Sequence, residues 1–153
     1  MPGTVREGRW KELRVISELL RFGLDVYPAA VDDQGIDCVI RTEHGGPPAY
    51  YDVQIKGYRG YNRVIGVDRA RVEQQAGKYL LIIAFFHDRA KPDEIFFLTQ
   101  PQVLRLKDNL PPGKDRWGDV AFNKPDRDEF AEQTIDKLKD FLEGHTPEGA
   151  NTT

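Results

Sequence analysis

The residues best suited to chemistry in this chain are Asp37, Gln54 and Lys56, which interrupt two otherwise apolar segments. Asp37 lies in the middle of residues 35–40, where the core of a β-strand favours aliphatic side chains. A charged side chain in a buried strand costs several kcal/mol unless it is paired or bound to a ligand. Two interpretations are open: an ion pair between Asp37 and Lys56 on a half-exposed sheet face, or a metal site.

The metal-site interpretation depends on the oxygen donors in these two segments. The Asp37 carboxylate, the Gln54 amide oxygen and the backbone carbonyl oxygen of Ile55 are hard ligands, which suit Mg²⁺. Lys56 lies two residues after Gln54, and its ammonium group could polarise a water molecule or stabilise negative charge on a phosphate. The residue types therefore allow metal-assisted chemistry at a phosphate group.

Other common catalytic arrangements lack candidate residues. The single serine, Ser17, lies within a predicted helix and not on a tight turn. The three histidines, His44, His87 and His145, do not have the spacing of a metal site. The chain has neither a glycine-rich phosphate loop nor a dinucleotide-binding fingerprint. Cys38, the only cysteine, excludes an internal disulfide framework, and we expect it to be a small buried hydrophobe on the strand face opposite Asp37.

The polar residues are positioned by a predicted hairpin of two strands, residues 35–41 and 50–57, joined by a turn at residues 43–48. A short extended segment at residues 24–28 precedes it. Side chains alternate along a strand, so one face of the second strand carries Asp52, Gln54 and Lys56 and the other carries Val53 and Ile55. Asp52 could supply an auxiliary carboxylate, although it also fits a polar residue at a solvated strand end.

Apolar periodicity predicts the remaining elements. Residues 6–22 form an amphipathic helix that Gly23 ends, and residues 67–78 form a second helix. Residues 79–86 are a continuous apolar run, which is typical of a strand covered on both faces. A strand at 94–98, a short helix at 101–106 and a final helix at 128–142 follow. The inward stripe of the first helix is Trp10, Leu13, Ile16, Leu19 and Leu20, and that of the last helix is Phe130, Ile135, Leu138, Phe141 and Leu142.

The order of elements predicts an α/β fold with a mixed central sheet. The chain of 153 residues fits a single domain, which we expect over residues 1–145, followed by a frayed tail at residues 146–153. The longest apolar run, residues 79–86, is far shorter than the roughly 20 residues of a membrane-spanning helix. The lack of an apolar leader and the single cysteine favour a cytoplasmic protein with no membrane association.

The charge is distributed unevenly, although the net charge is only −3. Residues 56–78 contain six basic and two acidic residues, whereas residues 126–148 contain eight acidic and three basic residues. Such asymmetry permits a local basic surface that a polyanion could use, although ordinary solvated faces are the simpler interpretation.

These motifs together resemble the PD-(D/E)xK nuclease superfamily, especially archaeal Holliday-junction resolvases and Mrr-like restriction enzymes. The pattern of that superfamily is a helix with a glutamate, a Gly-x-Asp strand, and a partner strand that reads (Glu/Gln)-x-Lys. The corresponding segments here are residues 8–12 (GRWKE), 35–37 (GID) and 54–57 (QIKG). The resemblance covers roughly residues 6–86 and implies a restriction-endonuclease-like αβββαβ core, with the later strand and helices as an addition.

The resemblance also implies roles for individual residues. Asp37 would be the central metal ligand, with Gln54, the Ile55 carbonyl oxygen and Glu12 completing the site for Mg²⁺ or Mn²⁺. Lys56 would be the catalytic lysine, and Glu18 is a competing helix carboxylate whose spacing fits less well. The neutral Gln54 replaces the usual acidic ligand and weakens attraction for a divalent cation. The chain is therefore expected to be a metal-dependent endonuclease or, alternatively, a catalytically inactive nuclease-like module that binds nucleic acid or a protein partner.

The segment after Lys56 has the composition of a nucleic-acid contact. It alternates aromatic and basic residues between glycines, and two arginines follow on the next predicted helix; the candidates are Tyr58, Arg59, Tyr61, Arg63, Arg69 and Arg71. A plain flexible loop is the competing interpretation. The expected partner is nucleic acid, with DNA preferred, and an enzyme of this size that cuts two strands would act as a homodimer or with a partner.

Overall fold

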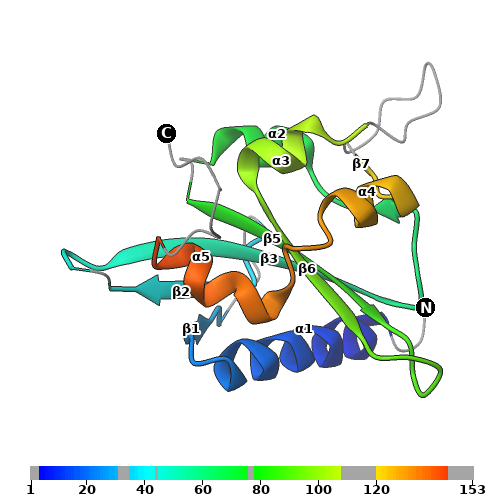
Figure 1. Cartoon of the computed structure of the whole chain (residues 1–153), viewed down its shortest axis with the longest axis horizontal. Coiled ribbons are helices and arrows are strands. Elements are labelled where there is room, and N and C mark those ends of the chain that lie inside the picture. The colour runs from blue at the N-terminus through cyan, green and yellow to red at the C-terminus, as the bar shows by residue number, and fades with distance from the viewer. Residues whose placement is uncertain (1–3, 31–34, 44, 76–77, 108–119, 145–153) are drawn as a thin grey trace.

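The structure is a computed structural model, and it describes residues 4–30, 35–43, 45–75, 78–107 and 120–144. A five-stranded sheet in the order β1-β2-β3-β5-β6 forms its centre, and β4 and β7 form a separate two-stranded sheet. Helices lie on both sides of the five-stranded sheet, with α1 on one side and α2 and α3 on the other (Figure 1). The predicted α/β fold with a mixed central sheet is confirmed. The tail predicted at residues 146–153 lies outside the described residues.

The hairpin predicted from the turn cluster is present. Strands β1 (Asp25–Pro28), β2 (Cys38–Thr42) and β3 (Ala49–Arg59) are antiparallel neighbours, and β2 pairs with β3 from Cys38 opposite Val53 to Thr42 opposite Ala49. β2 begins three residues later than predicted, so Asp37 immediately precedes the strand. β3 ends two residues later than predicted, at Arg59, and so runs well past Val53, the partner of the first residue of β2.

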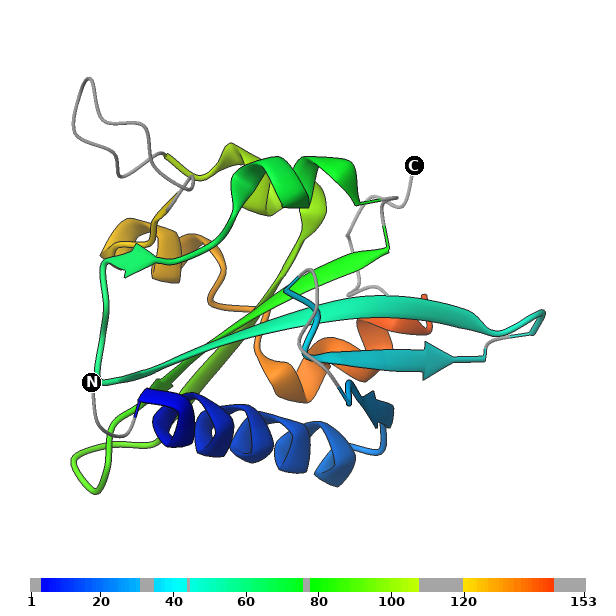
Figure 2. The same ribbon diagram turned by 180° about the vertical axis from the view of Figure 1, so that it is seen from behind.

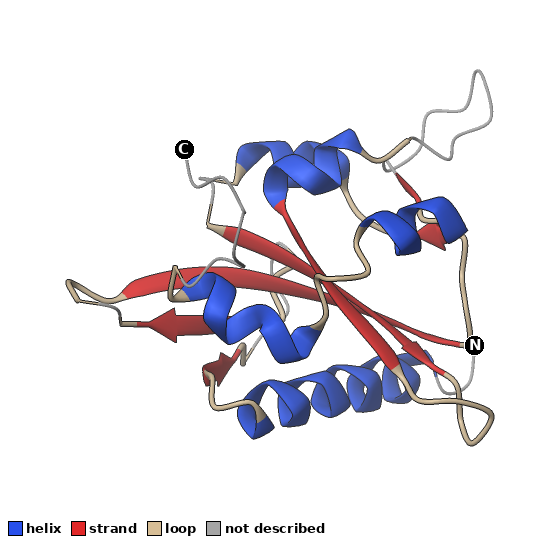
Figure 3. Ribbon diagram, in the orientation of Figure 1, coloured by secondary structure: helices blue, strands red, loops and turns tan. Residues whose placement is uncertain are grey.

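The centre of the sheet is apolar on both faces, as the uninterrupted run of apolar residues predicts. All eight residues of β5 (Tyr79–Phe86) are buried. β5 pairs in parallel with β3 and antiparallel with β6 (Glu94–Thr99), which makes the sheet mixed. Figure 3 shows β5 crossing the middle of the molecule between its two neighbours.

Helix α1 (Thr4–Arg21) covers one face of the sheet together with the helical turn η1 (Ile135–Lys137) and α5 (Leu138–Leu142). Figure 2 shows α1 lying along this side for most of its length. Its buried stripe is Val15, Ile16 and Leu19. Leu13 and Leu20 were wrongly predicted to face inward and are 47% and 54% exposed, because the helix is rotated so that the neighbouring stripe contacts the sheet.

The other face is covered by shorter elements: α2 (Arg69–Gln74), α3 (Gln100–Arg105), α4 (Lys124–Glu129), β4 (Val64–Ile65) and β7 (Val120–Ala121). The helix predicted over residues 67–78 is only six residues long. Asp68 caps its beginning, and the Gln100 side chain donates hydrogen bonds of 2.7 Å to the carbonyl oxygens of Val72 and Gln75 at its end. A contact from α3 thus satisfies the carbonyl groups that a longer helix would use.

The prediction of one continuous final helix over residues 128–142 is wrong. α4 and α5 are separate, and in the segment between them Gln133 and Thr134 pair with β6. The Phe97 N–H donates to the Gln133 carbonyl oxygen at 2.9 Å, and the Gln133 side chain donates to the Phe97 carbonyl oxygen at 2.8 Å. The four inward residues Phe130, Ile135, Leu138 and Leu142 are nevertheless buried, while Phe141 is 38% exposed and contacts Phe97. No helix in the described ranges has the length and apolar character needed to cross a bilayer.

Candidate metal centre

Asp37 is a buried acid held by the main chain at the start of β2. Its side chain and backbone together are 7% exposed. Its N–H donates to the Val53 carbonyl oxygen at 2.8 Å, and its carboxylate Oδ2 accepts the N–H of Ile55 at 2.6 Å. No ion pair joins Asp37 and Lys56 among the described residues, and the backbone of β3 holds the Asp37 carboxylate.

The Ile55 carbonyl group points to the same side of β3 as the Ile55 N–H that bonds Asp37. The N–H and C=O groups of one strand residue point to the same side, and alternate residues point to the same neighbour. Val53 bonds Asp37 through its carbonyl oxygen and Ile55 bonds Asp37 through its N–H, so the Ile55 carbonyl also points to the β2 side. Because β2 pairing begins at Val53, this carbonyl lies beyond the paired part of the strand.

Gln54 lies on the face opposite Val53 and has a partner that the sequence did not predict. The hydroxyl of Tyr79, the first residue of β5, donates a hydrogen bond of 2.7 Å to Gln54 Oε1. Burial and then the charge of Asp37 raise the pKa of the Tyr79 hydroxyl. Asp37, Gln54 and Tyr79 therefore form one polar cluster where β2 begins. The sequence hints at this contact only through Tyr79, whose hydroxyl begins a run that otherwise contains only aliphatic residues and phenylalanine.

Lys56 follows Gln54 on the same face of β3, opposite Ile83 of β5. Its side chain is half-buried. Within the residues that the structure describes, its ammonium group makes no hydrogen bond or ion pair. A lysine in this setting keeps its donors available for an anion placed at the polar cluster.

Glu12 lies on α1, which packs on the face of the sheet that carries Val53 and Ile55. The Cβ of Lys11 lies over Gly57, which places this turn of α1 against β3. Trp10 and Arg14 point toward the end of β5 and the β5–β6 turn. Residue 12 is about 100° further round the helix from residue 11, on the opposite flank. Glu12 therefore lies on the flank of α1 away from Trp10 and Arg14, is half-buried, and has Arg9 as an ion-pair partner at 3.3 Å.

The charges of Asp37 and Glu12 both act on the thiol of Cys38. Cys38 is completely buried in the core beneath α1, on the face predicted for it. Burial, and then the charges of Asp37 and Glu12, together raise the pKa of its thiol to about 12. Both carboxylates therefore lie close enough to Cys38 for their charges to act on its thiol.

The donor set fits a hard divalent cation by its chemistry. Glu12 and Asp37 offer carboxylate oxygens, Gln54 an amide oxygen and Ile55 a carbonyl oxygen, and Mg²⁺ is commonly bound by one or two carboxylates with other oxygen ligands and water. No group of three His, Cys, Asp or Glu side chains able to hold a metal occurs in the described part of the chain. The donor set described here contains only two carboxylates, so it does not meet that three-residue criterion. The other helix candidate, Glu18, pairs with Arg21 at 2.6 Å.

The residues predicted to bind nucleic acid are distributed over several environments. Tyr58 is half-buried, and its hydroxyl accepts the Gly66 N–H at 3.2 Å. Arg59 pairs with Glu7 at 3.0 Å and stacks on Trp10. These contacts attach the end of β3 to its surroundings, so two of the predicted residues have structural roles.

Three of the four other predicted residues, Tyr61, Arg69 and Arg71, have polar partners within the protein. Arg69 donates to the Leu104 carbonyl oxygen, and Arg71 pairs with Asp68 at 3.4 Å. Arg63 is exposed and forms no ion pair with another described residue. Tyr61 lies against the β5–β6 end of the sheet, where its ring packs on Phe85.

Comparison of the chain with protein-family models and with curated proteins found no match. The geometry of the residues is therefore the basis for assigning a function.

Proposed function

We propose that the protein is a metal-dependent nuclease that hydrolyses phosphodiester bonds, with DNA as the preferred substrate. The observation that carries this proposal is the meeting of Asp37, the Ile55 peptide and Gln54 at the start of β2, with Lys56 next on the strand. The resemblance to PD-(D/E)xK nucleases supports it, since Glu12 is on α1, Gln54 and Lys56 are on β3, and Asp37 immediately precedes β2.

Some of these residues would bind the metal ion, and Lys56 would act on the phosphate. Asp37, Glu12, Gln54 and the Ile55 carbonyl oxygen would hold Mg²⁺ or Mn²⁺. Such an ion supplies positive charge to a phosphate and lowers the pKa of water. The Ile55 N–H fixes the Asp37 carboxylate, which reduces the reorganisation needed on binding. Lys56 would place its ammonium group beside the phosphate and stabilise negative charge as the bond breaks.

A specific observation favours a second candidate function, a nuclease-like module that binds nucleic acid or a protein partner without cleaving it. Gln54 Oε1 already accepts the Tyr79 hydroxyl, and an amide brings no charge to a metal site. The oxygen has a second lone pair, so the bond does not prevent coordination. A competing donor and a neutral ligand both weaken the attraction for a divalent cation.

Cleavage assays with purified variants test the nuclease proposal. Wild type with Mg²⁺ or Mn²⁺ should cleave DNA, and Lys56→Ala should lower the rate at least about 100-fold because a charge that stabilises the transition state is lost. Lys139→Ala, on α5 beside Gly23, is the matched control and should retain full activity. Equal cleavage by wild type and Lys56→Ala would place the activity elsewhere. Absence of Mn²⁺ binding together with salt-sensitive DNA binding would favour the non-catalytic module.

A further inference from the structure

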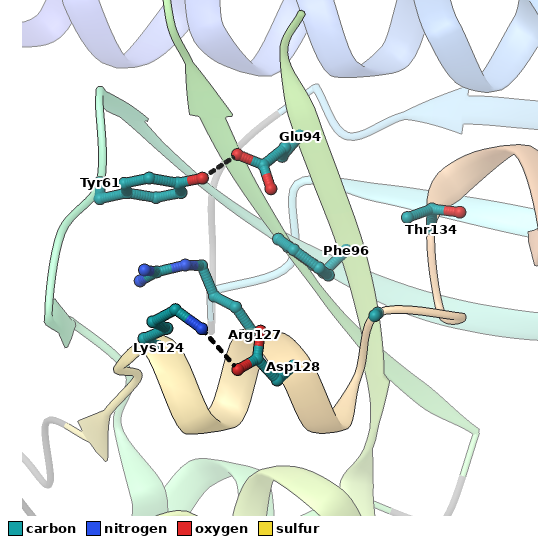
Figure 4. Close-up of a pocket in the computed structure, with 8 residues that line it drawn as sticks. Tyr61, Glu94, Phe96, Lys124, Arg127, Asp128 and Thr134 are labelled. Carbon is teal, nitrogen blue, oxygen red and sulfur yellow. Dashed lines mark hydrogen bonds and ion pairs between the residues drawn. The ribbon is translucent and has the colours of Figure 1, made fainter.

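A second polar pocket lies at the opposite end of β3 from the β2–β3 turn. It has a volume of about 230 Å³ and is lined by residues of the loop after β3, of β6, of α4 and of the segment after α4. Figure 4 shows Tyr61 facing Arg127 and Lys124 of α4, with Glu94 and Phe96 of β6 on the third side. None of the predicted metal ligands lines this pocket.

The carboxylates of the pocket already have partners. Glu94 accepts hydrogen bonds from the Tyr61 hydroxyl and interacts with His87 Nε2 at 2.8 Å. Lys91 lies 3.9 Å from the same carboxylate. The other acid, Asp128, pairs with Lys124 at 2.9 Å. Figure 4 draws the Tyr61–Glu94 and Lys124–Asp128 interactions as dashed lines. Neither acid is therefore left to neutralise a further cation.

Arg127 is the positively charged residue of the pocket that has no acidic partner among the described residues. Its guanidinium lies 3.8 Å from the centre of the Tyr61 ring, and its side chain is half-buried. It forms no ion pair with any residue in the described ranges. Stacking on an aromatic ring holds a guanidinium in a fixed orientation and leaves its N–H donors available at the edge. Among the lining residues the charges of Lys124 and Arg127 balance those of Glu94 and Asp128, and Lys91 beside Glu94 adds a positive charge next to the pocket.

We propose that this pocket binds a phosphate group through Arg127 and Lys124. A planar guanidinium matches two phosphate oxygens, and a nearby ammonium group adds a third donor. The volume lies below the about 300–1,000 Å³ of pockets that enclose drug-sized ligands, which suits a small anion such as a phosphate group. This inference does not depend on the nuclease activity, because it uses neither Asp37 nor Lys56.

Titration of the full chain with inorganic phosphate, in metal-free buffer of constant ionic strength, tests the proposal. The backbone amide NMR signals of Tyr61, Arg127 and Thr134 should shift and saturate. Arg127→Ala should weaken binding about tenfold or more, since a charged hydrogen-bond donor is removed. Arg21→Ala is the matched control, because Arg21 also stacks on a ring, that of Phe22 at 4.5 Å, but lies outside the pocket. Asp37→Asn should bind phosphate as wild type does.

A second variant separates loss of binding from loss of folding. Arg127→Lys keeps the charge without the planar fork, and should bind phosphate more weakly than wild type and more tightly than Arg127→Ala. Titration with a short oligonucleotide without terminal phosphates shows whether the pocket binds a phosphate of a nucleic-acid backbone or free inorganic phosphate. Shifts of the same amides by this oligonucleotide would assign a backbone phosphate, and shifts by inorganic phosphate alone would assign a free phosphate. Unsaturable shifts in wild type, or equal affinity in wild type and Arg127→Ala, would overturn the proposal.

Discussion

At the scale of single residues, the Asp37 carboxylate has a structural task as well as its proposed role in binding a metal. It is the acceptor for the buried N–H of Ile55, at 2.6 Å. A buried N–H without a partner destabilises the folded state because its interaction with water is lost on folding. The effect of a substitution at this position therefore depends on whether the new side chain can still accept that hydrogen bond.

We predict that Asp37→Ala lowers the free energy of unfolding by about 1–3 kcal/mol, since the Ile55 N–H loses its acceptor. Asp37→Asn should lower it less because an amide oxygen can still accept the bond. Urea denaturation of the two variants measures the difference. Mn²⁺ titration should show that both variants bind the ion more weakly than wild type, which separates the structural task from the metal-binding one. Equal destabilisation by Ala and Asn would contradict the role given to the hydrogen bond.

The buried thiol of Cys38 should make stability depend on alkaline pH. Its pKa is raised from an ordinary value of 9.0 to about 12 in the folded protein. Between these values the unfolded chain loses the proton and the folded chain keeps it, so the free energy of unfolding falls as pH rises, by about 1.4 kcal/mol per pH unit from this group. Below pH 9 the contribution is fully present.

Chemical denaturation at several pH values between 8 and 11 checks this dependence. The free energy of unfolding of Cys38→Ala should fall less steeply with rising pH than that of wild type, whatever the stability of the variant at pH 8. The raised pKa of Tyr79 adds a decline of the same sign that remains in this variant. Parallel curves for wild type and Cys38→Ala would show that the thiol does not titrate as the structure indicates.

At the scale of elements, the close approach of α1 to β3 places Glu12 near the hairpin. A Cβ atom at Gly57 would lie 2.9 Å from the Lys11 Cβ and 3.0 Å from a ring carbon of Phe86. These distances are shorter than ordinary van der Waals contacts, so the glycine is needed for the helix to lie this close to the strand. The other glycine of this helix–strand pair, Gly8, has no heavy atom within 4 Å of such a Cβ.

We predict that Gly57→Ala lowers the free energy of unfolding by about 1–3 kcal/mol through overpacking. Gly8→Ala, on an exposed part of the same helix, should raise it by roughly 0.5–1 kcal/mol because alanine favours the helical conformation. Thermal or urea denaturation of both variants measures the two opposite changes. A stabilised Gly57→Ala would mean that α1 does not approach β3 as closely as described.

At the scale of the whole molecule, the net charge of −3 requires any contact with nucleic acid to be local. Of the predicted arginines, Arg59 and Arg71 are already paired with Glu7 and Asp68. A paired arginine must exchange one anion for another on binding, whereas an unpaired one gains an interaction. Fewer phosphates should therefore be neutralised than the basic composition of residues 56–78 suggests.

We predict that Arg63→Ala reduces the slope of the logarithm of DNA affinity against the logarithm of salt concentration by about 0.9, the value of one phosphate contact. Arg71→Ala is the matched comparison and should change the slope less, because its ion pair with Asp68 already neutralises it. Fluorescence anisotropy at several KCl concentrations gives the slopes. A larger effect of Arg71→Ala than of Arg63→Ala would contradict the proposed contact surface.

Local patterns were sufficient to predict most of the fold. The turn cluster at residues 43–48 predicted the hairpin, and the apolar run predicted the buried central strand. The helix predicted over residues 67–78 and the continuity of the last helix were wrong, because the Gln100 and Gln133 side chains bond backbone groups of distant segments. Periodicity within a segment carries no information on such contacts. The proposed roles of Glu12, Asp37, Gln54 and Lys56 stay predictions.

What the sequence determined by itself is which side chains share a strand face and in which order the elements follow, since both depend on local backbone geometry. The tertiary structure alone decided that Tyr79 bonds Gln54, that Asp37 bonds the Ile55 peptide and not Lys56, and that Arg127 stacks on Tyr61. Each of these contacts joins segments far apart in the chain. Their partners are chosen by strand register and by the packing of helices on the sheet, which only the folded molecule specifies.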